Sequence, residues 1–307
     1  MEKQVTILRG EPIIIPIAEM SLSPLGVEQM MEWVETHRPA CLPEKAEGEL
    51  NNWKQLFPHD LVEYTPPVAL DAAGLGLEIH CQTARPLTSN ELLVELAGRK
   101  CYDSFGLKAG KKSNREYIAN TQSGDIPHSS IMYHAKMSFF FAGISRRVSH
   151  EIIRNYVGAD RDEEGSPSQE STRFTHHYGF FIEPPRYGAL EDQAYKEQMQ
   201  QLFGMSMQDV YDRYTEAIDI ECRAWLRIHG KMPTSIDKKR IYEAASSFLP
   251  HQAETSFIWT TNPSAIAKFV RERNNPAADL EIQRFAEKWR RICMERWPNL
   301  FPQPWMS

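Results

Sequence analysis

The chain has 307 residues, a formal net charge of −6 and a hydrophobic content of 41%. This length and content are enough for one large domain or two modest ones with a packed core, and the weakly acidic balance argues against a nucleic-acid partner, whose binding proteins are usually basic. No apolar run approaches the roughly 20 residues of a membrane-spanning helix and the sequence opens without a signal peptide, so we expect a cytoplasmic protein with no membrane partner.

The first 76 residues are predicted to form an N-terminal extension to a main domain at residues 77–307. One helix is predicted in this extension, from Pro24 to Thr36. A loop-rich tract follows it, interrupted by Pro43, Pro58, Pro66 and Pro67.

Three elements are predicted at the start of the main domain. Leu77 to Gln82 is expected to be a strand. Thr88 and Glu91 have the spacing of a capping box, which predicts a helix running to Lys100. A second helix is expected from Asn114 to Thr121.

The middle of the chain is rich in aromatic and apolar residues. Ser129 to Phe141 predicts a buried strand, and Thr172 to Ile182 predicts another. A long helical tract follows from Leu190 to Ile228, with Gly204 as a candidate break.

The last third of the chain contains both helical and strand patterns, without a regular alternation between them. Ser235 is expected to cap a helix that runs to Phe248, and Glu254 to Thr261 is predicted as a strand. Asn262 and a first-turn proline begin the next helix, and an amphipathic helix follows from Ala277 to Trp297. Because strands and helices do not alternate regularly, the order of elements predicts an α+β fold rather than a doubly wound sheet.

Metal sites are not expected. The five cysteines are odd in number and have no C-x-x-C spacing, which predicts neither a disulfide framework nor a structural zinc site. Acidic residues at 160–165 match half of a calcium loop, but Ser171 stands where that loop needs a glutamate. His176 and His177 are adjacent on a predicted strand and would point to opposite faces.

One segment in the middle of the chain carries most of the chemical information. Apolar Ile144, Val148 and Ile152 follow the i, i+4, i+8 spacing of a helix that packs on one face. Polar and basic residues, including Glu151 and Arg154, would then project from the other faces. The segment therefore predicts a short helix with a basic and aromatic tip.

Hydroxyl and guanidinium groups follow this helix after an acidic spacer. Ser171, Thr172 and Arg173 offer donors within three residues, which is what a phosphate monoester needs. A solvated basic turn explains the same residue types, and residue types alone leave both interpretations open.

This segment resembles the defining motif of flavin-dependent thymidylate synthases, in which Ser-Arg and Ser-His precede Arg-His-Arg and a loop leads to Ser-x-Arg-Tyr. The matching positions are Ser145-Arg146, Ser149-His150, Arg154-Asn155-Tyr156 and Ser171-Thr172-Arg173-Phe174. Further blocks resemble the family in the same order, at Ala97–Ser104, Phe248–Pro250, Trp259–Asn262, Arg273 and Glu281-Ile282. Together they cover about residues 77 to 297.

The resemblance implies a central, mostly antiparallel sheet flanked by helices, assembled as a homotetramer whose active sites combine several subunits. It also implies C5 methylation of a pyrimidine nucleoside monophosphate, dUMP to dTMP, with FAD as cofactor and with methylenetetrahydrofolate and NAD(P)H as co-substrates. The partners are then nucleotide and folate small molecules. None of the cysteines stands in a context that would lower its pKa, so a thiolate nucleophile is not expected.

The resemblance assigns roles to particular residues. Arg273 and Gln169 are expected to be catalytic. Substrate binding is assigned to Glu151, Ser171, Thr172, Arg173 and Arg273. Flavin binding is assigned to Cys101, Arg154, Asn155, Tyr156, Asn262 and Lys268.

Several positions depart from the family pattern. Asn155 and Tyr156 replace two residues of the Arg-His-Arg core, Ser246 stands at the place of an arginine that helps to bind deoxyuridylate, and Ser264 at that of a flavin-contacting arginine. Two alternatives therefore stay open: a homologue that acts on UMP or a cytidine nucleotide, and a catalytically silent oligomer that binds a nucleotide or flavin.

Overall fold

The computed structural model describes residues 4–37, 53–57, 60–65, 83–105, 112–123, 128–157, 167–302 and 306. At residues 35, 53, 55, 62–65, 83–84 and 154–157 only the backbone is described. Within these ranges no helix is long and apolar enough to cross a membrane.

The chain divides into two compact units, each assembled from segments distant in sequence. The sheet unit comprises Met1–Ile17, Ser138–Thr260 and Phe269–Trp289. The helical unit comprises Ala18–Met137, Thr261–Lys268 and Arg290–Ser307. The predicted boundary at residue 76 lies outside the described residues and stays a prediction.

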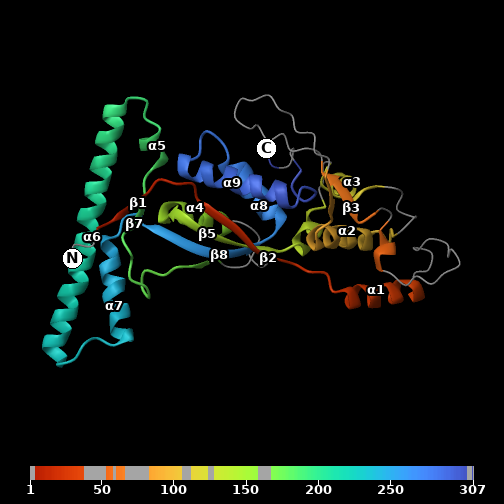
Figure 1. The fold of residues 1–307 in the computed structure, drawn as a ribbon. Helices are drawn as coiled ribbons and strands as arrows, with labels where there is room; N and C mark the ends of the chain where they lie inside the picture. The colour runs from red at the N-terminus through yellow and green to blue at the C-terminus, as the bar shows by residue number, and fades with distance from the viewer. Residues whose placement is uncertain are drawn as a thin grey trace. The chain divides into compact units, whose positions relative to one another are not determined.

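A four-stranded antiparallel sheet organises the sheet unit (Figure 1). Its strands, in spatial order, are β2 (Ile13–Glu19), β5 (Met137–Ser145), β8 (Glu254–Thr261) and β6 (Ser168–Gln169). The Ser138 and Thr260 hydroxyls lie 2.8 Å apart, and Gly143 N–H donates to Glu254, so β5 and β8 run in opposite directions. A separate parallel pair joins β1 (Thr6–Leu8) to β7 (Phe180–Ile182).

Aromatic side chains fill the core of this unit. Phe141 stacks on Phe257 of β8 with ring centroids 4.8 Å apart, and it also contacts Phe139 of its own strand and rings on α9 (Leu280–Arg296). Trp289 meets Phe139 edge-on at 5.4 Å. All four rings are buried. Since aromatic residues bury large apolar areas, these contacts hold α9 against the sheet.

Helices α6 and α7 of the sheet unit lie side by side (Figure 1). Buried residues shared by β7, α6 and α7 form a second core, which includes Phe181, Tyr214 and Ile241. The remaining elements are α4 (Arg146–Val157), α5 (Pro185–Gly188), α6 (Gln193–His229), α7 (Ser235–Ala245) and the 3-10 turn η5 (Ser246–Phe248). Helix α8 (Pro263–Arg273) contributes residues to both units.

The helical unit has its own core between α1, η2 and α2, formed by residues such as Val34, Leu56 and Leu96. Its elements are α1 (Pro24–His37), η2 (Trp53–Leu56), β3 (Val62–Thr65), β4 (Thr83–Pro86), α2 (Ser89–Cys101), α3 (Asn114–Gln122) and η4 (Ser129–His134). The predicted capping box of α2 is confirmed, since Thr88 Oγ1 accepts from Glu91 N–H and Glu91 accepts from Thr88 N–H.

Buried carboxylates link the segments of this unit through ion pairs and hydrogen bonds. Glu91 forms a two-bond ion pair with Arg85, at 2.6 and 2.8 Å, and accepts from the backbone N–H of Asn299. Glu95 pairs with Arg99 and accepts from the amide of Asn114. Because each buried carboxylate has donors on more than one segment, the network fixes how those segments meet.

Local patterns predicted most elements well. Strand β8 begins and ends where expected, and α1, α2 and α3 do so within about two residues. The predicted strand at Leu77 to Gln82 lies outside the described residues.

Four predictions were wrong or only partly right. Residues 129–134 form a 3-10 helix, because alternating burial begins only at Met137. Helix α6 runs through Gly204 without a break, since one glycine costs a helix only about 1 kcal/mol. The strand expected at 172–182 is reduced to its last three residues, and the final helix begins at Leu280 rather than Ala277.

Candidate functional site

Helix α4 carries the first part of the motif, from Arg146 to Tyr156. Strand β5 ends at Ser145 and the helix begins at the next residue, so the strand fixes its starting direction. Ile144, Val148 and Ile152 are almost completely buried, as the spacing predicted. The faces that carry Arg147 and Glu151 are therefore turned away from the core.

Arg273, at the end of α8, lies against α4. Its Nε is 3.5 Å from Glu151 Oε2, a distance that allows an ion pair but not a good hydrogen bond. Arg273 Nε is buried without a hydrogen-bond partner among the described residues. The guanidinium thus sits beside a carboxylate and keeps donor capacity for a ligand.

The expected flavin-binding tip lies one helical turn further along. Arg154 follows Glu151 by three residues, which places both on neighbouring positions of the α4 surface. The side chains of Arg154, Asn155 and Tyr156 lie outside the described residues, so only their place at the end of α4 is established. Arg273 and the tip therefore belong to the same end of α4.

Gln169 joins three elements of the sheet unit. It lies on β6, the edge strand that pairs with β8 through Ser168 and Gln169. Its Nε2 donates to Ser149 Oγ of α4 at 2.9 Å and to Thr255 Oγ1 of β8 at 3.0 Å. Both donor hydrogens are thereby used, and the amide oxygen remains as an acceptor.

The segment with Ser171, Thr172 and Arg173 is a turn rather than the start of a strand. Ser171 O accepts from the N–H of Phe174 and Thr175, and Ser171 Oγ accepts from Arg173 N–H. Such local hydrogen bonds from a serine compete with strand pairing, which explains the error.

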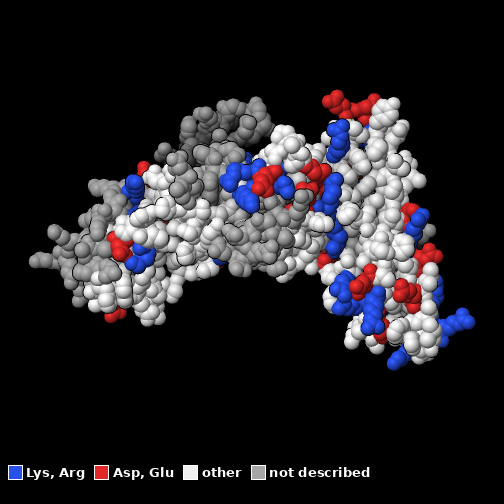
Figure 2. Space-filling view, turned by 180° about the vertical axis from the view of Figure 1, so that it is seen from behind, with Lys and Arg blue, Asp and Glu red and all other residues white. Residues whose placement is uncertain are grey.

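Arg173 points from this turn to α7. It forms an exposed ion pair with Glu243, with an N–O distance of 3.1 Å, and Lys239 Nζ lies 4.4 Å above the ring of Phe174. Lys, Arg, Asp and Glu side chains are interspersed over α6 and α7 (Figure 2). An exposed pair of this kind is worth about 1 kcal/mol or less, so Arg173 can exchange Glu243 for a more highly charged anion.

Arg146 is a further charged residue that the role assignments did not include. Burial lowers the pKa of its guanidinium, while the carboxylates of Glu170 and Glu254 oppose that shift. Its Nη2 donates to Glu170 O at 2.9 Å, and Nε has no hydrogen-bond partner in the described part of the chain. The Ser-Arg pair that opens the motif was the available signal for this residue.

Two ionisable carboxyls lie near the base of α4. Burial raises the pKa of Glu281, which accepts from the N–H and Oγ–H of Ser145 at 2.8 and 2.9 Å. Burial also raises the pKa of Glu254, and the N–H of Gly143 donates to its side chain. These carboxylates fix the junction between β5 and α4.

The start of α8, in the helical unit, holds three buried polar atoms that lack hydrogen-bond partners among the described residues: Thr261 Oγ1, Asn262 Nδ2 and Ser264 Oγ. Asn262 Oδ1 caps the helix by accepting from Ala265 N–H at 3.1 Å. An unpaired buried polar group costs about 1–3 kcal/mol, so a ligand with acceptors would stabilise this cluster.

Lys268 and Cys101, the other expected flavin contacts, also belong to the helical unit. Lys268 is half-buried on α8, and Cys101 is exposed at the end of α2. The role of Cys101 stays a prediction. Ser246 ends α7, where its hydroxyl donates to Glu243 O at 2.8 Å.

The chain is similar to a family of known proteins over about two thirds of its length. Residues 86–299 match the family model described as thymidylate synthase complementing protein. A flavin-dependent thymidylate synthase of Mycolicibacterium vanbaalenii is 30% identical over 211 residues, which cover 68% of this chain and 77% of that protein. The enzyme of the same name from Mycobacterium avium is 30% identical over 68% of this chain and 76% of its own length. That of Corynebacterium aurimucosum is 27% identical over 70% and 80%.

Proposed function

This chain belongs to the flavin-dependent thymidylate synthases, a family of methyltransferase enzymes, and from that premise we propose that it methylates a pyrimidine nucleoside monophosphate at C5 in the cytoplasm. The substrate is dUMP, the carbon donor is methylenetetrahydrofolate and the reductant is NAD(P)H. The observation that carries the proposal is the placement of Arg273 against Glu151 of α4, where its Nε forms an ion pair but has no hydrogen-bond partner among the described residues.

The nucleotide is held by charge. Ser171, Thr172 and Arg173 bind its phosphate, since a dianion attracts the Arg173 guanidinium more strongly than the exposed Glu243 carboxylate does. Arg273 donates to a carbonyl oxygen of the pyrimidine and stabilises the negative charge that develops on the ring. Glu151 orients Arg273, and Gln169 presents its amide oxygen from β6.

The residues fit a flavin. Arg154, Asn155 and Tyr156 at the tip of α4 are the groups of the sheet unit that would hold FAD, and Asn262, Lys268 and Cys101 are those of the helical unit. The unpaired donors of Asn262 and Ser264 suit the carbonyl and ring-nitrogen acceptors of an isoalloxazine. Bound FAD, once reduced, supplies the hydride of the reaction. The chain's own contribution is to orient the reactants and to exclude competing geometries.

A second candidate substrate is UMP or a cytidine nucleotide. Ser246 favours it, because this position has a hydroxyl already bound to Glu243 O and carries no positive charge for the nucleotide. The Arg273 contact would serve either pyrimidine.

We also propose a homotetramer. The edge strand β2 exposes Ile13, Ile15 and Ile17, each by nearly half of its surface. Further exposed apolar residues lie along α6, at Tyr195, Leu202, Met205, Ile220, Leu226 and Ile228. Contiguous exposed apolar surface is typical of an interface. Light scattering of Ile15→Lys should give a smaller particle than the wild type, and an unchanged tetramer would exclude β2 from the interface.

The nucleotide assignment is tested by Arg273→Ala. Turnover of dUMP is expected to fall about a hundredfold or more, because a donor to the developing charge is lost. Arg213→Ala is the matched control, since Arg213 forms an exposed pair with Asp209 on α6 at 2.9 Å. Arg173→Ala should weaken nucleotide affinity. Wild-type kinetics in both site variants would refute the assignment.

The flavin assignment is tested by Asn262→Asp. Aspartate keeps the oxygen that caps α8 but loses the amide donor and adds a negative charge. The melting temperature should therefore stay close to the wild-type value while flavin affinity, measured by absorbance, falls. Asn275→Asp is the control, because Asn275 Oδ1 also accepts a backbone N–H, from Ala277. Equal flavin binding by both variants would contradict the assignment.

A further inference from the structure

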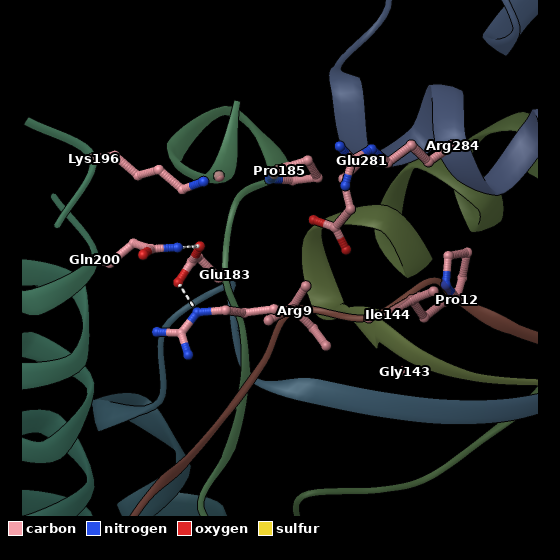
Figure 3. Close-up of a pocket in the computed structure, with 13 residues that line it drawn as sticks. Arg9, Pro12, Gly143, Ile144, Glu183, Pro185, Lys196, Gln200, Glu281 and Arg284 are labelled. Carbon is pink, nitrogen blue, oxygen red and sulfur yellow. Dashed lines mark hydrogen bonds and ion pairs between the residues drawn. The ribbon is translucent and has the colours of Figure 1, made fainter. Parts of the chain in front are cut away.

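A pocket lies in the sheet unit, near the ends of β5 and β7 and beside α6 and α9 (Figure 3). Its volume is about 310 Å³, and Pro12, Ile144, Ile182 and Pro185 form apolar parts of its wall. Because a water molecule occupies about 30 Å³ of liquid, the space is roughly ten waters in size. A single inorganic ion would leave most of it empty.

Both carboxylates in the wall already have donors. Glu183 is buried and accepts from Arg9 Nε and Gln200 Nε2, each at 2.6 Å. Glu281 is buried and accepts twice from Ser145. Neither group therefore needs a cation from a ligand.

The basic side chains in the wall have fewer partners than the carboxylates. Lys196 and Arg284 have no side-chain hydrogen bond or ion pair within the described ranges, and Arg9 engages only its Nε, so both terminal nitrogens remain available. Lys196 comes from α6 and Arg284 from α9, on opposite sides of the pocket (Figure 3). Lys196 and Arg284 thus add two positive charges to a cavity in which Glu183 is already paired with Arg9 and Glu281 with Arg147, at 3.5 Å.

We propose that this pocket binds a small organic phosphate. Lys196, Arg284 and the terminal nitrogens of Arg9 hold the phosphate dianion, because charge-assisted hydrogen bonds from Arg and Lys are the strongest donors to phosphate. The organic part of the ligand rests on the apolar wall beside Ile144 and Ile182.

This site is separate from the proposed nucleotide site. Glu281 and Ser145 mark the first turn of α4, whereas Tyr156 lies ten residues beyond the start of the helix, or about 15 Å at 1.5 Å per residue. The phosphate-binding turn at Ser171 to Thr175 makes its contacts with α7.

Calorimetric titration of the full-length protein tests the proposal with three probes. Ribose 5-phosphate carries both the phosphate and an organic part, inorganic phosphate carries only the charge, and ribose carries only the body. Ribose 5-phosphate should bind most tightly, inorganic phosphate more weakly and ribose not measurably. Absence of ribose 5-phosphate binding, or equal affinity for it and inorganic phosphate, would overturn the proposal.

Charge-neutralising variants locate the bound probe. The pair Lys196→Gln and Arg284→Gln should weaken ribose 5-phosphate binding about tenfold or more, since two charged donors are lost. The control pair Arg227→Gln and Lys231→Gln, at the exposed end of α6, should leave it unchanged. Arg173→Ala distinguishes the two sites: binding that survives the pocket variant but disappears with Arg173→Ala would contradict the proposal.

Discussion

His177 illustrates how the fold changes the chemistry of a single residue. Burial, with Arg146 and His176 nearby, lowers its pKa from 6.5 to about 4. The imidazole accepts from Gly179 N–H through Nδ1, and Tyr214 Oη accepts from the backbone N–H of His177. The sequence pattern placed this residue on a strand with a surface or partly packed side chain, and the structure buries it beside α6 instead.

This environment makes folding stability depend on pH. Between pH 6.5 and about 4 the unfolded chain binds a proton at His177 that the folded chain does not, so stability falls as the pH falls through this window. The loss should not exceed about 3.5 kcal/mol for a shift of this size. Chemical denaturation of wild type and His177→Asn at pH 7 and pH 4.5 measures it.

The asparagine variant should lose less stability than the wild type over that pH interval, because it has no imidazole to protonate. Glu254 and Glu281 have raised pKa values and shift the dependence of both proteins in the opposite direction, so the comparison isolates the histidine. Equal pH dependence in the two proteins would show that His177 titrates normally.

Gly98 is a residue where even one methyl group should matter. A Cβ there would lie 2.6 Å from Tyr117 Oη, and Tyr117 is held under the Arg99 guanidinium, 4.5 Å from the ring centroid. Gly98→Ala should therefore reduce the free energy of unfolding by about 1–3 kcal/mol. Gly204→Ala, in open space on α6, should raise it by about 0.5–1 kcal/mol. The same sign for both would contradict this packing.

At the scale of elements, two capping boxes differ in burial. Glu91 caps α2, is fully buried and pairs with Arg85, whereas Glu116 caps α3 at the surface. Glu91→Ala should cost about 3–5 kcal/mol, because it leaves the charge of Arg85 without its partner. Glu116→Ala should cost far less. Urea denaturation of both variants measures the difference, and similar midpoints would show that the Arg85 pair adds nothing to the cap.

Element prediction succeeded where the signal was local. The capping box of α2, the bounds of β8 and the i, i+4, i+8 spacing of α4 each lie within one short window. The predicted cap of α7 was wrong by one residue, since Thr234 rather than Ser235 accepts from Asp237 N–H. The expected strand after Ser171 failed because hydrogen bonds within the turn outweighed the β-propensity of its aromatic residues. The residue types were correctly identified as donors, but their backbone conformation was not.

At the scale of the molecule, the sequence indicated the family but not the tertiary contacts between residues that are distant in sequence. Gln169 reaches Thr255, 86 residues away, and Arg273 meets Glu151 across more than a hundred residues. Such contacts depend on how the sheet and α8 pack, which no local window contains. The spaced motifs supplied the candidates, and the fold determined which of them lie together.

Two polar sites of different character occur in one chain. At the Arg273 site an ion pair leaves the buried Nε without a hydrogen-bond partner among the described residues, and the pocket beside Ile144 holds Lys196 and Arg284 next to carboxylates that already have donors. Motifs supplied the residues of the first site, whereas no motif indicated the second, because its lining comes from segments that are distant in sequence.

Release of tritium from C5-labelled dUMP tests the central claim most directly. The purified protein, supplied with FAD, NADPH and methylenetetrahydrofolate, should release tritium and form dTMP, and UMP or dCMP should react more slowly. If flavin-loaded protein released no tritium from any of the three nucleotides, the proposal that it methylates pyrimidines would be contradicted.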